Sequence, residues 1–280
     1  MIAEGGLVTP ATEGARTSTT QIVLVHGACH GPWCWEPIVE PVRAHGFGVQ
    51  APELPMTSLD ADVDVVRRAV RQARESGPVL LVGHSYGGVV ITAAGHDADE
   101  LLYCTATMPD NDQSATDVFP RLFTPELADA LETSEDGTEL VLHPERSIPA
   151  FFNRCTAEVI GQLRPRLRPI HQVCFTEPVG PAAWRTVPAT YIVCSDDHAM
   201  SVEYQEACAT ALGDSIHLDS DHSLFYTATA ELISRVVEIA ERLAQAAPSA
   251  VDRTRHKLAD AACAAYDIGA DDRGFGHRRR

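Results

Sequence analysis

The chain has 280 residues, a length that suits one large α/β domain or one domain that carries an inserted segment. Its formal net charge of −17 argues against nucleic acid or an anionic membrane as a partner. Lys257 is the only lysine and lies outside the expected core, so a Schiff-base mechanism is not expected.

The ends of the chain and its cysteines point to a reducing cytoplasm. Residues 1–20 are rich in small residues without periodicity, which predicts a flexible arm, and they contain no signal-peptide pattern. No apolar run approaches the length that spans a membrane. The eight cysteines form no C-x-x-C pair, so we expect buried thiols rather than disulfides or a zinc site.

Short apolar runs alternate with helical patterns along most of the chain. We expect six strands, at residues 21–26, 49–51, 79–82, 101–105, 190–194 and 215–218. We expect helices at residues 33–45, 58–76, 201–212 and 228–246. This alternation predicts an α/β fold with a mostly parallel six-stranded sheet and helices on both faces.

The alternation stops between residues 109 and 184, where prolines and short helical patterns stand in place of strands for the sheet. We interpret residues 109–184 as an inserted helical lid on a core formed by residues 21–108 and 185–246. Residues 247–280 are rich in Ala, Asp and Arg, and we expect a mostly mobile tail of unknown role.

The most informative stretch is VLLVGHSYGGVVI, residues 79–91, which places a Gly-x-Ser-x-Gly turn between an apolar strand and an apolar helix. Gly83 and Gly87 flank Ser85 because the reversal leaves no space for side chains two positions away. Such a turn exposes the serine hydroxyl above the sheet edge. Ser85 is therefore the expected nucleophile.

A serine hydroxyl needs a base within hydrogen-bond reach and a carboxylate that orients the base. Where this turn occurs in hydrolases, the order along the chain is Ser, Asp, His. Asp196 and Asp197 follow the fifth expected strand, and His222 follows the sixth. We expect His222 as the base and Asp197 as its partner, with Asp196 in reserve. His217, inside a strand, and His84, which we expect to point along the turn, suit the role of base less well.

The loop after the first strand, HGACHG at residues 26–31, is rich in small residues whose backbone amides can face a ligand. The backbone N–H groups of Ala28 and Tyr86 are the expected donors of an oxyanion hole. Because His222 must be neutral to act as a base, turnover should fall below about pH 6 to 7.

The chain resembles the plant methylesterase and hydroxynitrile lyase branch of the α/β-hydrolase superfamily, over about residues 21–246 and least in the lid. The resemblance rests on Val23–Gly31 with Trp33 and Trp35, Val82–Gly88, Met108–Asp110, Tyr191–Cys194 with Asp197, and Asp221-His222. It implies an α/β-hydrolase fold, no metal and no organic cofactor. It also implies the catalytic triad Ser85, Asp197 and His222, with Ala28 and Tyr86 as oxyanion donors. Lyases of this branch carry Thr or Asn at the position of Gly27, and some carry Lys at that of Ser223, so the resemblance favours an esterase.

We therefore expect a serine carboxyl-ester hydrolase that forms an acyl-enzyme on a small or medium, partly apolar ester. One alternative is a lyase, a C–C hydrolase or a cyclase that acts on a biosynthetic intermediate at the same site. Another is a ligand-binding receptor on a hydrolase scaffold. Five lid residues are candidates either to line an apolar pocket or to attach the lid to the core: Phe119, Phe123, Phe151, Phe152 and Phe175. Substrate identity and oligomeric state stay open.

Overall fold

The computed structural model describes residues 19–246. The expected arm over residues 1–18 and the expected tail over residues 247–280 lie outside the described residues. Thr20, which we assigned to the arm, is buried, and its hydroxyl donates a 2.8 Å hydrogen bond to the carbonyl oxygen of Ala240.

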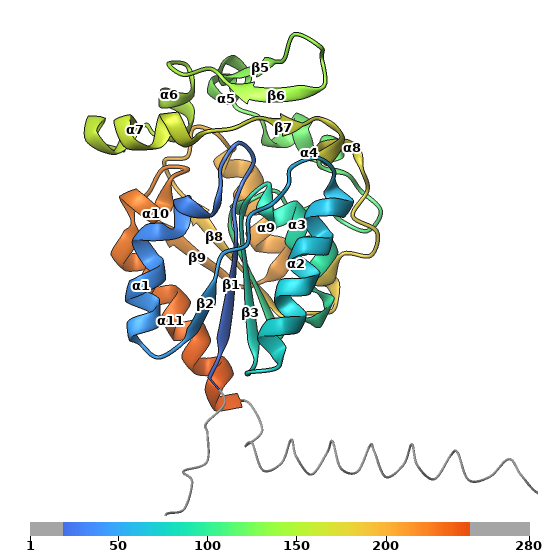
Figure 1. Cartoon of the computed structure of the whole chain (residues 1–280), viewed down its shortest axis with the longest axis vertical. Helices are drawn as coiled ribbons and strands as arrows, with labels where there is room; N and C mark the ends of the chain where they lie inside the picture. Colours follow the sequence, from blue (N-terminus) through green and yellow to red (C-terminus); the bar gives the residue numbers. More distant parts are fainter. Residues whose placement is uncertain (1–18, 247–280) are drawn as a thin grey trace, which may run out of the picture. The chain divides into compact units, whose positions relative to one another are not determined.

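The expected six-stranded sheet is confirmed, with strand order β2-β1-β3-β4-β8-β9 and parallel pairing throughout (Figure 1). The strands are β1 (Gln21–Val25), β2 (Gly48–Gln50), β3 (Val79–Ser85), β4 (Glu100–Ala106), β8 (Ala189–Cys194) and β9 (Ser215–Leu218). Every residue of β4 and all of β3 except Ser85 are buried, because a parallel sheet is covered on both faces. The carboxyl ends of these strands form the edge where the candidate site lies.

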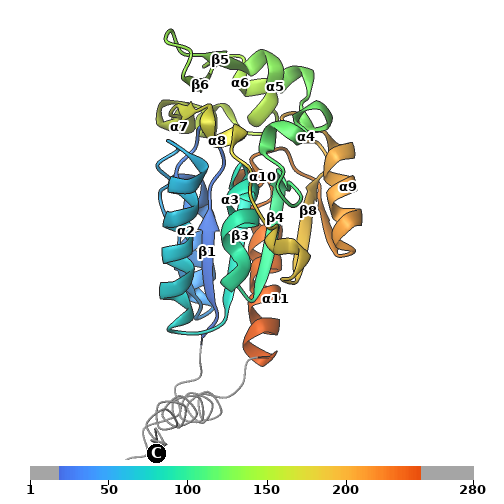
Figure 2. The same cartoon turned by 90° about the vertical axis from the view of Figure 1, so that its right-hand side faces the viewer.

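Helices cover both faces of the sheet, as Figures 1 and 2 show. On one face lie α1 (Glu36–Ala44) and α11 (Thr229–Ala246), and on the other lie α2 (Leu59–Arg74), α3 (Gly87–Ala94) and α9 (Val202–Leu212). Ser58 begins α2, since its side chain accepts a hydrogen bond from the backbone N–H of Ala61. Gly213 ends α9 in a left-handed conformation with φ 75°, which glycine adopts without strain. Shorter elements are α10 (Leu224–Thr227) and the 3-10 turns η1 (Pro32–Trp35), η2 (Gly95–Asp97), η3 (Arg164–Arg166) and η4 (Ala183–Arg185).

Most of the segment of residues 109–184 lies across the carboxyl ends of the central strands, at the top of Figures 1 and 2. Its last residues reach η2 at the C-terminal end of α3, where Nε2 of His96 lies 3.0 Å from the Pro181 carbonyl oxygen. This segment contains helices α4 (Ala115–Leu122), α5 (Pro125–Ala130), α6 (Ser147–Phe151), α7 (Ala157–Leu163) and α8 (Val173–Thr176). The expected helices are thus present, but the segment is not helical throughout. It also forms a three-stranded antiparallel sheet from β5 (Leu131–Thr133), β6 (Glu139–Leu142) and β7 (Ile170–His171). These strands are too short for a period-two pattern to stand out, and β6 pairs with β7 across about thirty residues of chain.

Among the helices of residues 19–246, none combines the length and the apolar character needed to cross a membrane.

Candidate active site

Ser85 stands at a sharp reversal of the chain between β3, which it ends, and α3, which begins at Gly87. Its φ of 53° lies in the left-handed region, which costs a non-glycine residue about 1–3 kcal/mol. A Cβ atom on Gly83 would lie 2.7 Å from the carbonyl oxygen of Gly87, and one on Gly87 would lie 2.5 Å from that of Val25. Both distances are shorter than real Cβ atoms show. The turn therefore requires glycine at both flanking positions, as expected from the sequence.

His222 and Asp197 come together from the loops that follow β9 and β8. The two atoms His222 Nδ1 and Asp197 Oδ2 are 2.8 Å apart, and both side chains are buried. Because an ionised carboxylate accepts only, Nδ1 carries the imidazole proton and Nε2 keeps its lone pair. The His222 Nε2 atom has no hydrogen-bond partner within residues 19–246, and His222 lines the same pocket as Ser85. This tautomer is the one that a general base requires.

The Asp197 carboxylate is fixed by four further hydrogen-bond donors. Its Oδ1 accepts from the backbone N–H groups of Ala199 at 2.8 Å and Met200 at 2.9 Å. Its Oδ2 accepts from the Gln205 amide at 3.1 Å and from the Thr105 hydroxyl. A carboxylate held in this way stays in position to orient an imidazole and to stabilise an imidazolium.

The other acidic and imidazole candidates lie away from this contact. The Asp196 side chain is 46% exposed, and its Oδ1 lies 3.4 Å from Nε2 of His198. His217 is exposed and pairs with Glu206 at 3.0 Å. Of the two adjacent aspartates, Asp197 is thus the one that the structure places beside His222.

Ala28 and Tyr86, whose backbone N–H groups are the expected oxyanion donors, line the same pocket as Ser85. Among the described residues, neither N–H group has a backbone or side-chain acceptor. The Gly27 carbonyl oxygen accepts a 2.9 Å hydrogen bond from Nδ1 of His26. In a trans peptide the C=O and N–H point in opposite directions, so this bond directs the Ala28 N–H away from His26.

Three buried histidines support the loops around Ser85, a role that no motif in the sequence indicates. His30 Nδ1 donates to the Ala28 carbonyl oxygen at 2.8 Å, and His84 Nε2 donates to that of His222 at 2.9 Å. Burial lowers the pKa of His26 to about 3 and that of His30 to about 4, and it moves the pKa of His84 well below its ordinary value. All three are therefore neutral near pH 7. His84 packs against the His222 ring, with ring centroids 4.7 Å apart, instead of pointing along the turn.

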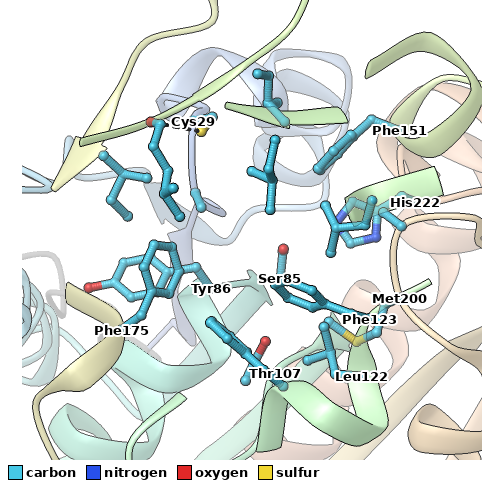
Figure 3. Close-up of a pocket in the computed structure, with 18 residues that line it drawn as sticks. Cys29, Ser85, Tyr86, Thr107, Leu122, Phe123, Phe151, Phe175, Met200 and His222 are labelled. Atoms are coloured by element: carbon cyan, nitrogen blue, oxygen red, sulfur yellow. Dashed lines mark hydrogen bonds between the residues drawn. The ribbon is translucent and has the colours of Figure 1, made fainter. Parts of the chain in front are cut away.

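The pocket above Ser85 is small, about 60 Å³, and mostly apolar (Figure 3). Ser85 directs its hydroxyl into the middle, with the His222 ring on one side and Tyr86 on the other. The walls come from the core and from residues 109–184, and they include four of the five expected phenylalanines: Phe119, Phe123, Phe151 and Phe175. Phe152 is buried and is absent from the lining of this pocket. In this described pocket no Asp, Glu, Lys or Arg is among the lining residues, so the walls suit an uncharged group.

Comparison with known proteins places this geometry in a family. The model of the alpha/beta hydrolase family matches residues 22–235, and the chain belongs to that family. Methylesterase 2 of Arabidopsis thaliana is 29% identical over 211 residues, which cover 65% of this chain and 80% of the relative. Norfluorocurarine synthase 1 of Strychnos nux-vomica is 26% identical, covering 79% of this chain and 95% of the relative.

The fold is also similar to a solved structure. A pyrethroid hydrolase from Sphingobium faniae superimposes with a TM-score of 0.70 at 22% identity, covering 81% of this chain and 99% of that one. The expected resemblance to plant methylesterases and the α/β-hydrolase fold are both confirmed.

Proposed function

We propose that this chain is a serine carboxyl-ester hydrolase that acts through an acyl-enzyme. Ser85 is the nucleophile, His222 the general base and acid, and Asp197 the group that orients His222. The observation that carries the proposal is the 2.8 Å contact between Asp197 and His222, because it leaves the His222 Nε2 lone pair free in the pocket that Ser85 also lines. The membership of the alpha/beta hydrolase family supports the same chemistry.

The reaction proceeds in two halves. His222 Nε2 takes the proton of Ser85 Oγ as the oxygen attacks the ester carbonyl, and the tetrahedral oxyanion accepts hydrogen bonds from the Ala28 and Tyr86 N–H groups. His222 then returns the proton to the leaving alcohol, and the acyl group stays on Ser85. A water molecule, deprotonated by His222, then attacks the acyl-enzyme. The bond between the acyl carbon and Ser85 Oγ breaks, the acid product leaves, and His222 returns the proton to Ser85 Oγ. Neither half requires a metal or an organic cofactor.

The substrate class is a small or medium ester without charge near the acyl carbon. The uncharged, phenylalanine-rich pocket supports this class, since an unpaired charge is costly to bury. The name of the Arabidopsis relative supports the cleavage of an ester. Gly27 also supports hydrolysis rather than a lyase reaction, because a Cβ atom there would lie 2.8 Å from that of Ser85 and would crowd the nucleophile.

The relative named as a synthase supports a second candidate function. In it, the same serine site would act on an intermediate of a biosynthetic route and yield a product other than a simple acid and alcohol. Both candidate functions use the same pocket residues, so the geometry alone does not separate them. Turnover of simple esters separates them, because it is expected for the hydrolase.

We further propose that residues 109–184 act as a lid on a core formed by residues 21–108 and 185–246, in an enzyme of the cytoplasm. The first part is supported because residues of this segment, among them Phe119, Phe151 and Phe175, line the pocket that contains Ser85. The seven cysteines within residues 19–246 are free thiols, which supports the second part.

The experiment is hydrolysis of p-nitrophenyl esters of increasing acyl length by the wild type and by Ser85→Ala. Turnover by the wild type that is lost in Ser85→Ala is expected, and the optimal acyl length measures the pocket. If folded wild type cleaves none of these esters, the hydrolase proposal fails and the second candidate gains support.

A further inference from the structure

Arg168 lies in the 109–184 segment and contacts the loop that carries the Ala28 N–H group. The backbone N–H of Arg168 donates to the Cys29 carbonyl oxygen at 3.1 Å. Its side-chain Nε donates to the His30 carbonyl oxygen at 2.9 Å. A single residue of this segment thus holds two successive carbonyl groups directly after Ala28.

The same guanidinium also reaches the other side of the loop. Its Nη2 donates to the Leu54 carbonyl oxygen at 2.6 Å, and the Leu54 N–H donates to Nε2 of His26 at 3.1 Å. His26 in turn donates from Nδ1 to the Gly27 carbonyl oxygen at 2.9 Å. Arg168 is therefore connected through Leu54 and His26 to the Gly27 carbonyl group, which belongs to the peptide that presents the Ala28 N–H. On the other side it binds the carbonyl groups of the two residues that follow Ala28 directly.

The loop needs such support because its backbone is strained. Cys29 has a φ of 59°, in the left-handed region. This conformation costs a non-glycine residue free energy, and it persists only where contacts with neighbouring groups hold it. Met56 on the adjacent loop has a φ of 55°, and its carbonyl oxygen accepts from the His171 N–H at 2.9 Å. Both strained residues are thus held by backbone N–H groups of one short stretch, residues 168–171.

The ion pair between Arg168 and Glu53 contributes little to the stability of this loop. The Arg168 Nη1 atom lies 2.9 Å from Glu53, whose side chain is 66% exposed, and a pair so open to water contributes little. The hydrogen bonds to the three carbonyl groups are the contacts that fix the loop.

We propose that Arg168 is a positioning residue of the oxyanion hole: it holds residues 27–30 so that the Ala28 N–H faces the developing negative charge. The oxyanion hole is then complete only while residues 168–171 are docked against the core, which couples closure of the 109–184 segment to chemistry. This inference rests on the proposed ester hydrolysis at Ser85.

The test compares Arg168→Ala and Arg168→Lys with two controls, Glu53→Gln and Arg164→Ala. Arg164 is a close match, since its side chain is 34% exposed against 30% for Arg168 and it pairs with the exposed Glu145 at 2.7 Å. For p-nitrophenyl ester hydrolysis, Arg168→Ala should lower kcat about 10- to 100-fold with KM within about threefold, because one oxyanion donor is misplaced rather than removed. Arg168→Lys should fall between Arg168→Ala and wild type, since lysine lacks the fork that reaches two carbonyl groups. Both controls should stay within about twofold of wild type.

A second readout isolates the oxyanion hole. An alkyl boronic acid forms a tetrahedral adduct with an active serine, so its inhibition constant should rise in Arg168→Ala by about the factor by which kcat falls. A loss of packing alone would lower the concentration of active enzyme without this parallel change. If Arg168→Ala is unfolded by circular dichroism, Arg168→Lys supplies the same comparison.

The inference is overturned if folded Arg168 variants match Arg164→Ala in kcat, or if kcat falls while boronate affinity does not change. A wild type that is no faster than Ser85→Ala would overturn the hydrolase proposal itself, and this inference with it. The two failures are therefore distinguishable.

Discussion

Asp197 Oδ2 lies 2.8 Å from His222 Nδ1, and the neighbouring Asp196 faces the surface. Asp197→Asn should lower kcat by about 10⁴, because the asparagine amide favours the wrong histidine tautomer and no longer stabilises the imidazolium. KM for a p-nitrophenyl ester should change little. Asp196→Asn is the matched control and should keep kcat within about threefold. Equal losses in the two variants would contradict the assignment of Asp197.

The fold and the turn around Ser85 could be predicted because their signals are local. Four of the six strands, β1, β3, β4 and β8, contain short apolar runs, and Gly83 and Gly87 stand in a recognisable five-residue pattern around Ser85. Whether Asp196 or Asp197 orients His222 is decided by parts of the chain that are distant in sequence. It depends on contacts such as the Thr105 hydroxyl, 92 residues away, which no pattern near the aspartates reveals.

Other parts of the site could not be predicted because they depend on long-range contacts between ordinary residues. Arg168 is 138 residues from the His30 carbonyl oxygen that it holds, and in the sequence it is one of several arginines among prolines. Asp62 occupies a helical position beside Asp60 and Asp64 and carries no sign that it is buried. The β5-β6-β7 sheet arises in the same way, from pairing of segments that carry no strand pattern of their own.

Because Tyr86 and Asp62 form a buried hydrogen bond, we expect Tyr86→Phe to destabilise the protein to an extent that depends on pH. The Tyr86 hydroxyl donates to Asp62 Oδ2 at 2.8 Å, and burial raises the pKa of Asp62 in spite of this bond. Tyr86→Phe should lower the free energy of unfolding by about 2 kcal/mol at pH 8, where the carboxylate is charged. This loss of unfolding free energy should shrink as pH falls toward the raised pKa of Asp62. A protonated, neutral Asp62 is less costly to bury without the Tyr86 hydroxyl than a charged carboxylate is.

The measurement is urea unfolding of wild type and variant at pH 8 and pH 5.5. Tyr204→Phe is the control, since the buried Tyr204 hydroxyl accepts from the Met108 N–H at 2.9 Å instead of donating to a carboxylate. Its loss should be the same at both pH values. A Tyr86→Phe loss that does not depend on pH would argue against a charged Asp62 at pH 8.

The buried histidines predict that the protein loses stability in mild acid. Burial lowers the pKa of His26 from 6.5 to about 3, so below pH 6.5 the unfolded chain binds a proton that the folded chain does not. Stability therefore falls as pH drops through this window, by about 2 kcal/mol from His26 alone between pH 6.5 and pH 5. His30 adds to the same slope, because its pKa is lowered to about 4.

Chemical unfolding at several pH values between 8 and 5 measures this slope. His217→Gln changes an exposed histidine and should leave the curve as in wild type, whereas His26→Gln should flatten it and lower stability at pH 8. A wild-type curve that is flat over this range would refute the prediction. The expected decline of turnover below about pH 6 to 7 should be measured only where this curve shows folded protein.

We expect Phe123 to limit the length of the acyl group that the pocket accepts. It is the one large hydrophobic side chain within residues 19–246 that is exposed, at 37%, and it lines the pocket with its ring 4.6 Å from that of Phe119. Phe123→Ala should therefore open one wall and raise the ratio of kcat/KM for long over short p-nitrophenyl esters by about tenfold, since each further methylene then finds apolar contact. Phe152→Leu is the control, because Phe152 is buried outside the lining: it should lower stability and leave the ratio unchanged. If Phe123→Ala changes kcat/KM for all chain lengths by one common factor, Phe123 does not limit acyl length, and the boundary of the acyl site lies deeper, toward Phe151 and His222.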